Sequence, residues 1–587
     1  MEITSTWTAV AAATLLALGF GKARRRIELS RAKHRSLAGH SRIAKWIASQ
    51  VPGYAYDEAR FFGSDGAPAP VQLARRTGLQ ALAALYAERY ARTIASTREA
   101  RAALPDLAFT GTYRVPFQYS AFLREHLTVG AFLRAADGTT VEDLDGNRFI
   151  DLTGSYGVNL FGVDFYKACI AEAQRIAEPL GPVLGAYHPC VLDNVRRLQR
   201  ISGHEAVSFH MSGTEAVMQA VRLARYHTGK RYLVRFTGAY HGWWEDVQPG
   251  PGNPMPPRET YTLRDMDERT LHVLRTRTDI ACVLVNPVQA LHPNRNAPGD
   301  SALVAGRAGG AFDRAAYKGW LQRLREVCTE RGIVLILDEV FVGFRLAPGG
   351  AQEYFGVRAD LVTYGKTLGG GLPVGVICGP QRLMQRYRED RPADLCFARG
   401  TFNAHPYVMA AMNAFLRRLD LPETRALYAD LDRIWDARAG RLNALLEQSG
   451  LPLRVSNMST IWTVHYTSPS RYHWMLQFYL RAQGLALSWV GTGRLIFGLH
   501  FGDEDFEEVA SRFVAAALQM RADGWWWRDP NGSERDVRRA LLLEMLRERL
   551  PFLRGPRRPD RAASPSGDRP GGRAPAEPRP KPDAISA

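Results

Sequence analysis

The chain has 587 residues, of which 46% are apolar and 23% are charged. This is the composition of a globular protein with a large core, not of a disordered chain. The six cysteines form no CxxC pair and no metal-ligand spacing, so we expect reduced thiols in a cytosolic protein, with no disulfide framework and no metal site. The net charge is +17, of which residues 1–50 supply +7 and residues 551–587 supply +4. Because a nucleic-acid enzyme spreads such charge over its folded body, we expect no nucleic-acid partner.

The N-terminus contains an uncharged apolar run over residues 6–20, which extends back to Ile3. About 18 apolar residues is the lower limit for a helix that spans a bilayer. Lys22 and the arginines at 24–26 follow the run, whereas a cleaved signal peptide has its positive charges before it. By the positive-inside rule, this order predicts a single-pass transmembrane anchor over residues 1–21, with the rest of the chain in the cytoplasm. The alternative is an alanine-rich helix that packs on the protein or lies on the membrane surface.

The central part of the chain has the pattern of an α/β protein. Residues 22–106 indicate an N-terminal helical extension, interrupted by the Gly/Pro/Ala-rich stretch 63–70, and two Asp-Gly turns within residues 132–151 predict a hairpin. Continuous apolar runs favour a mostly parallel sheet covered on both faces, and they occupy residues 206–209, 232–236, 280–285, 333–337, 361–364 and 374–378. We therefore expect a large, mostly parallel sheet domain over residues 107–405 and a smaller C-terminal α+β domain over residues 406–520.

The C-terminal segment 521–550 contains three adjacent tryptophans, 525–527, and then a basic stretch with an apolar stripe over residues 534–550. Two interpretations remain open for this segment. It contacts a membrane interface, or the tryptophans pack on the N-terminal helices. The tail, residues 551–587, is rich in Pro, Arg, Gly and Ala, and we expect it to be disordered.

Two short motifs follow the first two strands of the predicted sheet. The sequence HMSGTE, residues 210–215, begins a helix, where backbone N–H groups, hydroxyls and the helix dipole can bind a phosphate. Ser212, Gly213 and Thr214 are the candidates, although an ordinary helix cap has the same pattern. The sequence GAYHGW, residues 238–243, presents Tyr240 after a strand. Its ring can stack on a planar cofactor, or it is a buried core tyrosine.

Two further motifs contain an acid and a lysine at strand ends. Asp338 lies in IVLILDEVFVGFR, residues 333–345. A buried carboxylate needs a positive partner, such as a protonated pyridine nitrogen, a loop backbone or an arginine. Lys366 lies before three glycines in LVTYGKTLGGGLPVGVICG, residues 361–379. A desolvated lysine there is nucleophilic enough to form an imine, although lone strand-end lysines are usually solvated.

In this order and spacing, the four motifs resemble the class III (fold-type I) family of PLP-dependent aminotransferases, and within it glutamate-1-semialdehyde 2,1-aminomutase and related aminotransferases. The resemblance covers residues 110–520 and is most specific over residues 337–380. It implies pyridoxal 5'-phosphate as the cofactor, held by Lys366 as a Schiff base. It also implies that Asp338 pairs with the pyridine nitrogen and that Tyr240 stacks on the ring.

The resemblance implies binding roles for other residues as well. Ser212, Gly213 and Thr214 bind the cofactor phosphate. Thr401, in the sequence Gly-Thr-Phe, reaches the phosphate of a partner subunit, which implies a homodimer with shared active sites. Ser155 and Tyr156, in the sequence GSYG at 154–157, line the substrate pocket.

The chain departs from the family pattern at three positions. Phe341 replaces a glutamine that contacts the ring hydroxyl in many members, and Asn286 replaces the glutamate of a Glu-Pro pair. Gly493 stands where the aminomutases have a glutamate, and Arg494 follows it. Many aminotransferases use an arginine there to bind a substrate carboxylate with its planar fork. Arg494 is therefore a substrate-binding candidate, and a surface or structural arginine is the alternative.

These departures favour an aminotransferase that moves an amino group from a donor amino acid to a ketone or aldehyde. The long N-terminal extension, which the soluble mutases lack, favours it as well. The expected anchor suggests a lipid-like or carrier-bound acceptor. The alternatives are a 2,1-aminomutase, which needs no external donor, and a non-catalytic scaffold, against which the joint presence of Lys366, Asp338 and Tyr240 argues.

Overall fold

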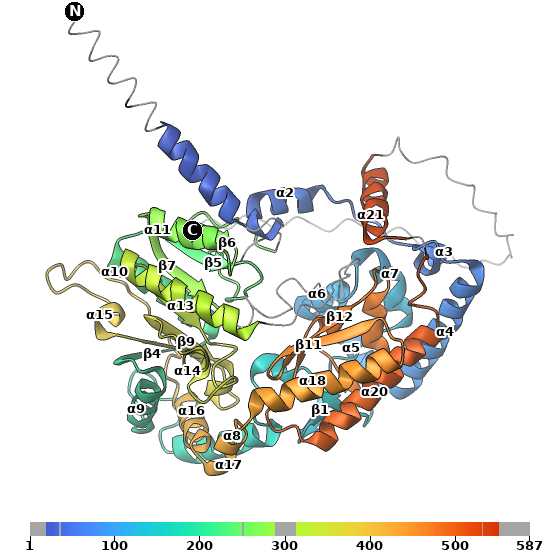
Figure 1. Cartoon of the computed structure of the whole chain (residues 1–587). Helices are drawn as coiled ribbons and strands as arrows, with labels where there is room; N and C mark the ends of the chain where they lie inside the picture. The colour runs from blue at the N-terminus through green and yellow to red at the C-terminus, as the bar shows by residue number, and fades with distance from the viewer. Residues whose placement is uncertain are drawn as a thin grey trace, which may run out of the picture.

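A computed structural model describes residue 14 and residues 19–33, 37–248, 250, 252–287, 313–530 and 532–550. The tail expected to be disordered, residues 551–587, lies outside these described residues. Figure 1 shows two halves, one around a large sheet and one in which the N-terminal helices lie beside the C-terminal elements. The second half is therefore made of segments that are far apart in the sequence.

Seven strands form the large sheet, in the order β4-β10-β9-β8-β7-β5-β6. Neighbouring strands are parallel except at β10, which is antiparallel to β4 and β9. The predicted mostly parallel sheet is confirmed, and each predicted strand agrees with an observed one to within a residue. The strands are β4 (Ala206–His210), β5 (Tyr232–Phe236), β6 (Thr260–Leu263), β7 (Ile280–Val285), β8 (Val334–Asp338), β9 (Leu361–Gly365) and β10 (Gly375–Gly379).

Helices cover both faces of this sheet, which explains why central strands such as β7 and β8 are apolar at nearly every position. Leu284 and Ile336 pack in one cluster with side chains of α10, whereas their neighbours Val283 and Leu335 pack in a second cluster with side chains of α13. Strands buried on both faces are continuously apolar. The helices of this half are α8 (Val163–Ala177), α9 (Cys190–Ser202), α10 (Gly213–Thr228), α11 (Glu268–Thr276), α13 (Arg314–Arg331), α14 (Gly350–Phe355), α15 (Gln381–Met384), α16 (Pro406–Leu419) and α17 (Pro422–Ala426).

Two small sheets complete the β structure. The predicted hairpin is confirmed as β1 and β2 of an antiparallel meander, which β3 extends and β13 joins in parallel. The C-terminal sheet has the order β11-β12-β14, with helices α18, α19 and α20 around it. The bounds are β1 (Leu133–Asp137), β2 (Thr140–Asp143), β3 (Arg148–Asp151), β11 (Leu453–Met458), β12 (Ile461–Tyr466), β13 (Leu485–Ala486), β14 (Leu495–Ile496), α18 (Leu431–Gln448), α19 (Leu476–Ala482) and α20 (Asp503–Ala522).

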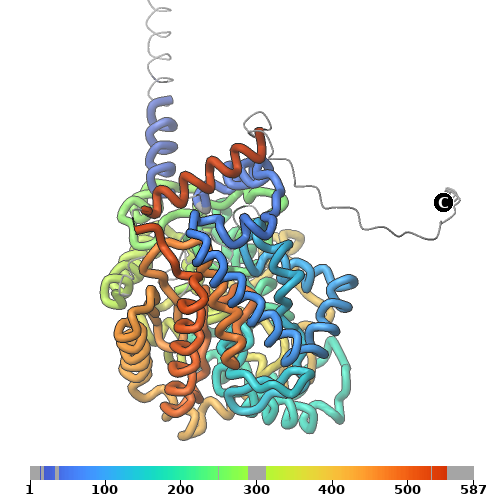
Figure 2. Tube along the Cα trace, turned by 90° about the vertical axis from the view of Figure 1, so that its right-hand side faces the viewer, coloured from blue at the N-terminus to red at the C-terminus, as the bar shows by residue number. Residues whose placement is uncertain are grey.

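The N-terminal helices pack against α19 and α20, as the tube view also shows (Figure 2). From α4, Tyr86 donates a hydrogen bond to the carbonyl of Phe478 (2.9 Å). The helices continue past residue 106, the predicted end of the extension. Pro105 begins α6 and Pro116 directly precedes α7, and the fixed φ of proline is favourable at the start of a helix. The bounds are α2 (Ser41–Gln50), α3 (Glu58–Gly63), α4 (Ala69–Arg89), α5 (Ala91–Arg101), α6 (Pro105–Tyr113) and α7 (Phe117–His126).

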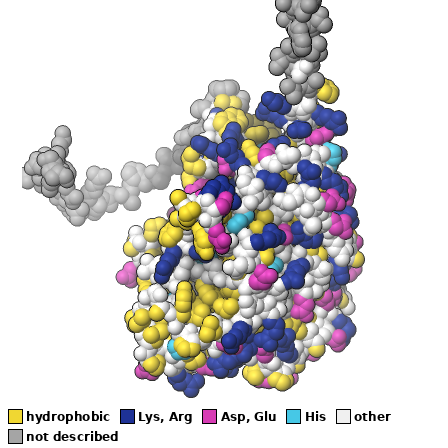
Figure 3. Space-filling model, turned by 90° about the vertical axis from the view of Figure 1, so that its left-hand side faces the viewer, with side chains coloured by type: hydrophobic (Ala, Val, Ile, Leu, Met, Phe, Trp, Pro, Cys, Tyr) yellow, Lys and Arg dark blue, Asp and Glu magenta, His cyan; other side chains and the backbone are white. Residues whose placement is uncertain are grey.

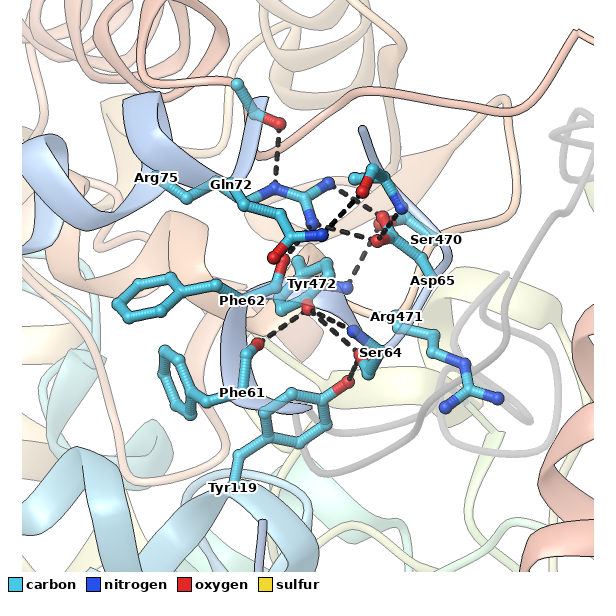
Figure 4. A network of polar contacts seen from close by, with 12 residues as sticks. Phe61, Phe62, Ser64, Asp65, Gln72, Arg75, Tyr119, Ser470, Arg471 and Tyr472 are labelled. Carbon is cyan, nitrogen blue, oxygen red and sulfur yellow. Dashed lines mark hydrogen bonds and ion pairs between the residues drawn. The ribbon is translucent and has the colours of Figure 1, made fainter. Parts of the chain in front are cut away.

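A buried polar network ties α3 and α4 to the C-terminal half (Figure 4). Arg75 of α4 is fully buried and donates two hydrogen bonds to the carboxylate of Asp65, at 2.8 and 2.7 Å. It also donates to the carbonyls of Phe62 (2.7 Å) and Gly524 (3.0 Å), and it lies 4.3 Å from the centre of the Tyr472 ring. The N-terminal extension is therefore a fixed part of the fold.

The prediction of a single N-terminal membrane pass with a cytoplasmic catalytic domain is wrong. Across the described residues, no helix combines the length and the apolar character needed to span a bilayer. Residues 1–13 and 15–18 of the predicted anchor lie outside the described part of the chain. The helix over residues 19–32 exposes Lys22 and the arginines at 24–26, and Arg24 pairs with Glu28 at 3.0 Å. Such charges are costly in a bilayer. The suggestion of a lipid-like or carrier-bound acceptor loses its basis with the anchor.

Of the tryptophans at 525–527, Trp525 packs on the N-terminal helices, which is one of the two interpretations that the sequence leaves open. Trp525 is fully buried, with ring contacts to Phe61 and Phe62 of α3. Its indole N–H donates to the hydroxyl of Tyr479 (2.8 Å), and Trp526 packs against the same core. Trp525 is thus not available to contact a membrane. The basic helix α21 (Glu534–Arg549) follows.

Candidate active site

A cavity of about 1020 Å³ opens at the carboxyl ends of the parallel strands. Asp338 is the last residue of β8, Lys366 follows β9, and Asn286 follows β7. Parallel strands bring their carboxyl ends to one edge of the sheet, and α/β proteins bind ligands at that edge. The topology therefore places these three side chains at a single site, although they are far apart in the sequence.

Most of the residues selected from the sequence line this cavity: Tyr156, Ser212, Gly213, Thr214, Tyr240, Asp338, Lys366 and Arg494. Ser155 instead lines a smaller neighbouring cavity, which Tyr156 also lines. Thr401 lies in an exposed turn and lines neither cavity. Ser155 and Tyr156 both have positive φ, 46° and 57°, and residues in this strained conformation cluster at functional sites.

The carboxylate of Asp338 is buried, with 2% of the residue exposed. It accepts hydrogen bonds from the ring nitrogen Nδ1 of His241 (2.7 Å) and from the backbone N–H of Val340 (3.1 Å). Burial lowers the pKa of His241, against the opposing effect of Asp338, so the ring is neutral at neutral pH. A buried carboxylate with neutral donors fits a cationic partner in the cavity. The motifs did not single out His241, although it directly follows Tyr240.

Lys366 begins the short 3-10 helix η4 (Lys366–Gly369) and has a φ of 48°, which is unusual for a lysine. Burial lowers the pKa of its amine, Asp338 raises it, and Arg494 and Arg345 lower it further. The net direction is downward, which increases the fraction of neutral, nucleophilic amine. Gly370 follows η4 with a φ of 60°, and a Cβ there would lie 2.4 Å from the carbonyl oxygen of Ala411. Only glycine allows this close approach.

The start of helix α10 forms another part of the cavity wall. Ser212 is the helix cap, and its hydroxyl accepts the N–H of Glu215 (3.3 Å), whose carboxylate accepts the N–H of Met211 (2.9 Å). The first N–H groups of a helix have no partner within the helix, and its dipole favours an anion there. A Cβ at Gly213 would lie 2.5 Å from the Val340 side chain, so glycine keeps this end of the helix close to the cavity. These residues suit a phosphate.

Arg494 and Phe341 also line the cavity. The guanidinium of Arg494 lies 5.8 Å from the centre of the Phe341 ring, and the amine of Lys366 lies 5.6 Å from it. Burial lowers the pKa of Arg494 to about 10, so it stays charged at neutral pH. Its Nε atom is buried without a hydrogen-bond partner. Phe341 therefore provides an apolar ring close to both cations, where the family pattern predicts a polar side chain.

A family model described as aminotransferase class-III matches residues 122–246 and 301–517. The chain belongs to the class III aminotransferase family. Helices α2 to α6 lie before the first matched residue, so the extension is outside the shared part of the family.

Similar proteins carry two kinds of name. The glutamate-1-semialdehyde 2,1-aminomutase of Desulfotalea psychrophila is 33% identical over 384 residues, which cover 60% of this chain and 81% of the relative. The aminomutase of Nitratidesulfovibrio vulgaris is 35% identical over 342 residues, which cover 57% of this chain and 77% of the relative. The solved structure of a transaminase with PLP bound is 27% identical, with a TM-score of 0.56, and covers 67% of this chain and 92% of its own. The solved structure of the Pseudomonas aeruginosa aminomutase with PMP shares the fold, with a TM-score of 0.60 at 19% identity. The match covers 76% of this chain and 98% of that structure's chain.

The cofactor of this class III enzyme is pyridoxal phosphate, and the residues of the cavity fit it. The buried carboxylate of Asp338 suits a protonated pyridine nitrogen, and the desolvated amine of Lys366 suits an aldehyde carbon. The first turn of α10, with Gly213 against Val340, suits the phosphate. An anion site, a carboxylate and an amine thus surround one cavity.

Proposed function

We propose that this class III enzyme is an aminotransferase that takes an amino group from a donor amino acid and delivers it to a ketone or aldehyde. The proposal rests on the cation at Arg494, next to Gly493, in the cavity that contains Lys366. Among the described residues, no carboxylate lies within ion-pair distance of Arg494, and its Nε has no partner. A guanidinium in this state is suited to bind the carboxylate of an amino acid with two hydrogen bonds.

The bound cofactor supplies an electron sink that stabilises negative charge at the substrate α-carbon. In this proposal, Lys366 holds the cofactor and afterwards moves the proton at the α-carbon through its Nζ atom. Asp338, supported by His241, keeps the pyridine nitrogen protonated. Tyr240 stacks on the ring, and Ser212, Gly213 and Thr214 bind the phosphate. Arg494 orients the substrate through its carboxylate, with Ser155 and Tyr156 beside the pocket.

A 2,1-aminomutase is the second candidate function, because relatives 33% and 35% identical to the chain bear that name. Such an enzyme returns the amino group to the same carbon skeleton and needs no external donor. Residue 493 argues against it, because glycine stands there where the aminomutases have a glutamate. The two candidates share the cofactor and the lysine, so only the demand for a donor separates them.

The deciding experiment follows the visible absorption of the purified holoenzyme after addition of L-glutamate or L-alanine. An aminotransferase loses the absorption of the lysine-bound cofactor and releases one keto acid per site, and a keto acid restores the spectrum. An enzyme that neither loses its absorption nor releases keto acid, but isomerises an amino aldehyde without a donor, is an aminomutase. A chain that shows no visible absorption with added PLP would contradict both functions. The variant Lys366→Ala should lack the lysine-bound absorption.

A further inference from the structure

A second cavity, of about 380 Å³, adjoins the active-site cavity. Tyr156, Ser488 and Trp489 line both, so the two cavities meet at these three side chains. Part of the wall of the second cavity comes from α5, α6, α7 and the turn between α6 and α7, and the rest comes from residues 127–156, α19 and residues 486–489. Helices α5 and α6 precede the first residue of the family match at 122. The part of the wall that contains Arg101 and Arg114 therefore lies outside the matched region, beside a shared active site.

Four arginines line the second cavity: Arg101, Arg114, Arg124 and Arg481. Arg101 lies close to α6, because a Cβ at Gly111 would be 3.2 Å from its guanidinium. Burial lowers the pKa of Arg101, and the charge of Arg124 lowers it further, as expected for cations that are near one another. The wall thus concentrates positive charge that the protein holds at a cost.

Hydrogen bonds fix the position of two of these arginines. Arg114 donates to the side-chain oxygen of Gln477 (3.1 Å) and to the carbonyl of Ser488 (3.3 Å), at the junction of the two cavities. Arg124 donates to the hydroxyl of Thr112 (2.9 Å). Side chains held in place before a ligand arrives lose little freedom when they bind it. The cluster is therefore organised in advance.

Among the described residues, three of these arginines, Arg101, Arg124 and Arg481, have no acidic partner. Arg481 is only 8% exposed, and its Nε and Nη2 atoms have no hydrogen-bond partner, nor does the Nε atom of Arg101. In the described part of the chain, no carboxylate lies within ion-pair distance of Arg101, Arg124 or Arg481. The one acid in the wall is Asp151; burial raises its pKa, and it accepts the N–H of Thr153 (2.8 Å). Buried cations without partners are costly unless a ligand supplies the opposite charge.

We infer that the second cavity is an anion-binding subsite for the far end of the substrate, which carries a carboxylate or phosphate group remote from the reacting carbon. The inference rests on the proposed function and deepens it by naming the substrate class. The reacting end lies beside Lys366, and the chain of the substrate passes Tyr156 and Trp489. Its anionic end lies among the arginines, where guanidinium groups bind carboxylate or phosphate through paired hydrogen bonds.

The first test compares three donors that share an α-amino acid head: L-alanine, L-glutamate and O-phospho-L-serine. In the double variant Arg101→Gln/Arg124→Gln, we expect KM to rise about tenfold or more for the donors with an anionic end and to stay within about twofold for L-alanine. Arg98→Gln is the matched control, because Arg98 is exposed on the same helix and does not line the cavity. An equal change for all three donors would overturn the inference. Arg124→Gln alone serves if the double variant does not fold.

The second test does not depend on the proposed reaction. Inorganic phosphate is titrated into the holoenzyme by calorimetry at constant ionic strength, so that the bound cofactor already fills its own phosphate site. We expect phosphate to bind the wild type and Arg98→Gln equally, and to bind the double variant at least tenfold more weakly. No binding to the wild type, or equal binding to the double variant, would contradict the subsite. If no donor reacts but phosphate binds as expected, the proposed function fails and the subsite stands.

Discussion

The residue after Asp338 is also a buried acid, and its environment differs. Asp338 faces the cavity, whereas Glu339 turns into the protein and accepts the N–H groups of Ala351 (2.6 Å) and Gln352 (3.1 Å). A Cβ at Gly350 would lie 2.0 Å from its carboxylate, so only glycine fits beside it. Two adjacent acids therefore have separate roles, one toward the cofactor and one in fixing the start of α14.

We expect Asp338→Asn to reduce kcat at least about a hundredfold while cofactor binding persists. The amide cannot supply the negative charge that keeps a pyridine nitrogen protonated, so the electron sink weakens. The measurement compares single-turnover rates with L-glutamate and the cofactor content from the absorption spectrum. Asp137→Asn, at an exposed position in β1, is the control and should change neither. A variant with wild-type rates would show that Asp338 has no part in the chemistry.

Glu339 makes the stability of the chain depend on pH. Burial raises its pKa from 4.5 to about 7, so between these values the folded chain binds more protons than the unfolded chain. The free energy of unfolding must then fall as pH rises through this window, by up to about 3 kcal/mol. Thermal unfolding of wild type and Glu339→Gln from pH 4.5 to 7.5 measures this. We expect the variant to be less stable overall but to lack this step, and parallel profiles would contradict the assignment.

At the scale of single residues, the sequence predicted the functional side chains that lie in a short, recognisable motif. Lys366, Asp338, Tyr240 and the Ser212–Thr214 turn each lie at or after the end of a strand, and the sheet brings them to one cavity. His241 was missed because its bond to Asp338 joins two strands that are distant in the sequence. The arginine cluster was also missed, since its members come from four separate elements. Only the packing of the N-terminal helices brings them together.

Among the elements, α4 depends on one buried ion pair. Arg75 holds Asp65 and the carbonyls of Phe62 and Gly524 at once (Figure 4). We expect Arg75→Ala to reduce the free energy of unfolding by about 3–5 kcal/mol, because it leaves a carboxylate and two carbonyls without a partner. Chemical denaturation measures the change. The neighbouring variant Arg76→Ala breaks an exposed ion pair with Glu58 and should cost less than about 1 kcal/mol. Similar losses in both variants would refute the network's importance.

Strands were easier to predict than the helices around them. The buried strands are continuous apolar runs, so their ends agree with the sequence to within a residue. The edge strand β6 was missed because it has only four residues, Thr260–Leu263, with two threonines among them. The apolar run at the N-terminus was overvalued, because the described helix over residues 19–32 contains Lys22 and the arginines at 24–26. A hydropathy pattern does not show where a helix stops.

At the scale of the whole molecule, one face exposes large apolar side chains. The segment between α15 and α16 exposes Leu395, Phe397 and Phe402, and Thr401 lies among them. Hydrophobic side chains gather on the lower half of the face seen from the left of Figure 1 (Figure 3). Exposed apolar patches of this kind mark surfaces that bind a partner. We propose that a second copy covers this face and that Thr401 then reaches the cofactor phosphate of the partner subunit.

The homodimer is tested by light scattering of the holoenzyme, which should give twice the mass of one chain. In the double variant Phe397→Asp/Phe402→Asp, charges replace side chains that are 69% and 51% exposed in one chain. We expect this variant to be monomeric, because burying two carboxylates in an apolar interface is costly. It should also bind PLP more weakly, because each site then loses Thr401 of its partner.

Leu73→Asp, at an exposed position on α4, is the control and should leave the dimer intact. A wild-type monomer that binds PLP fully would overturn shared active sites, whereas a dimeric variant with weakened PLP binding would place the interface elsewhere.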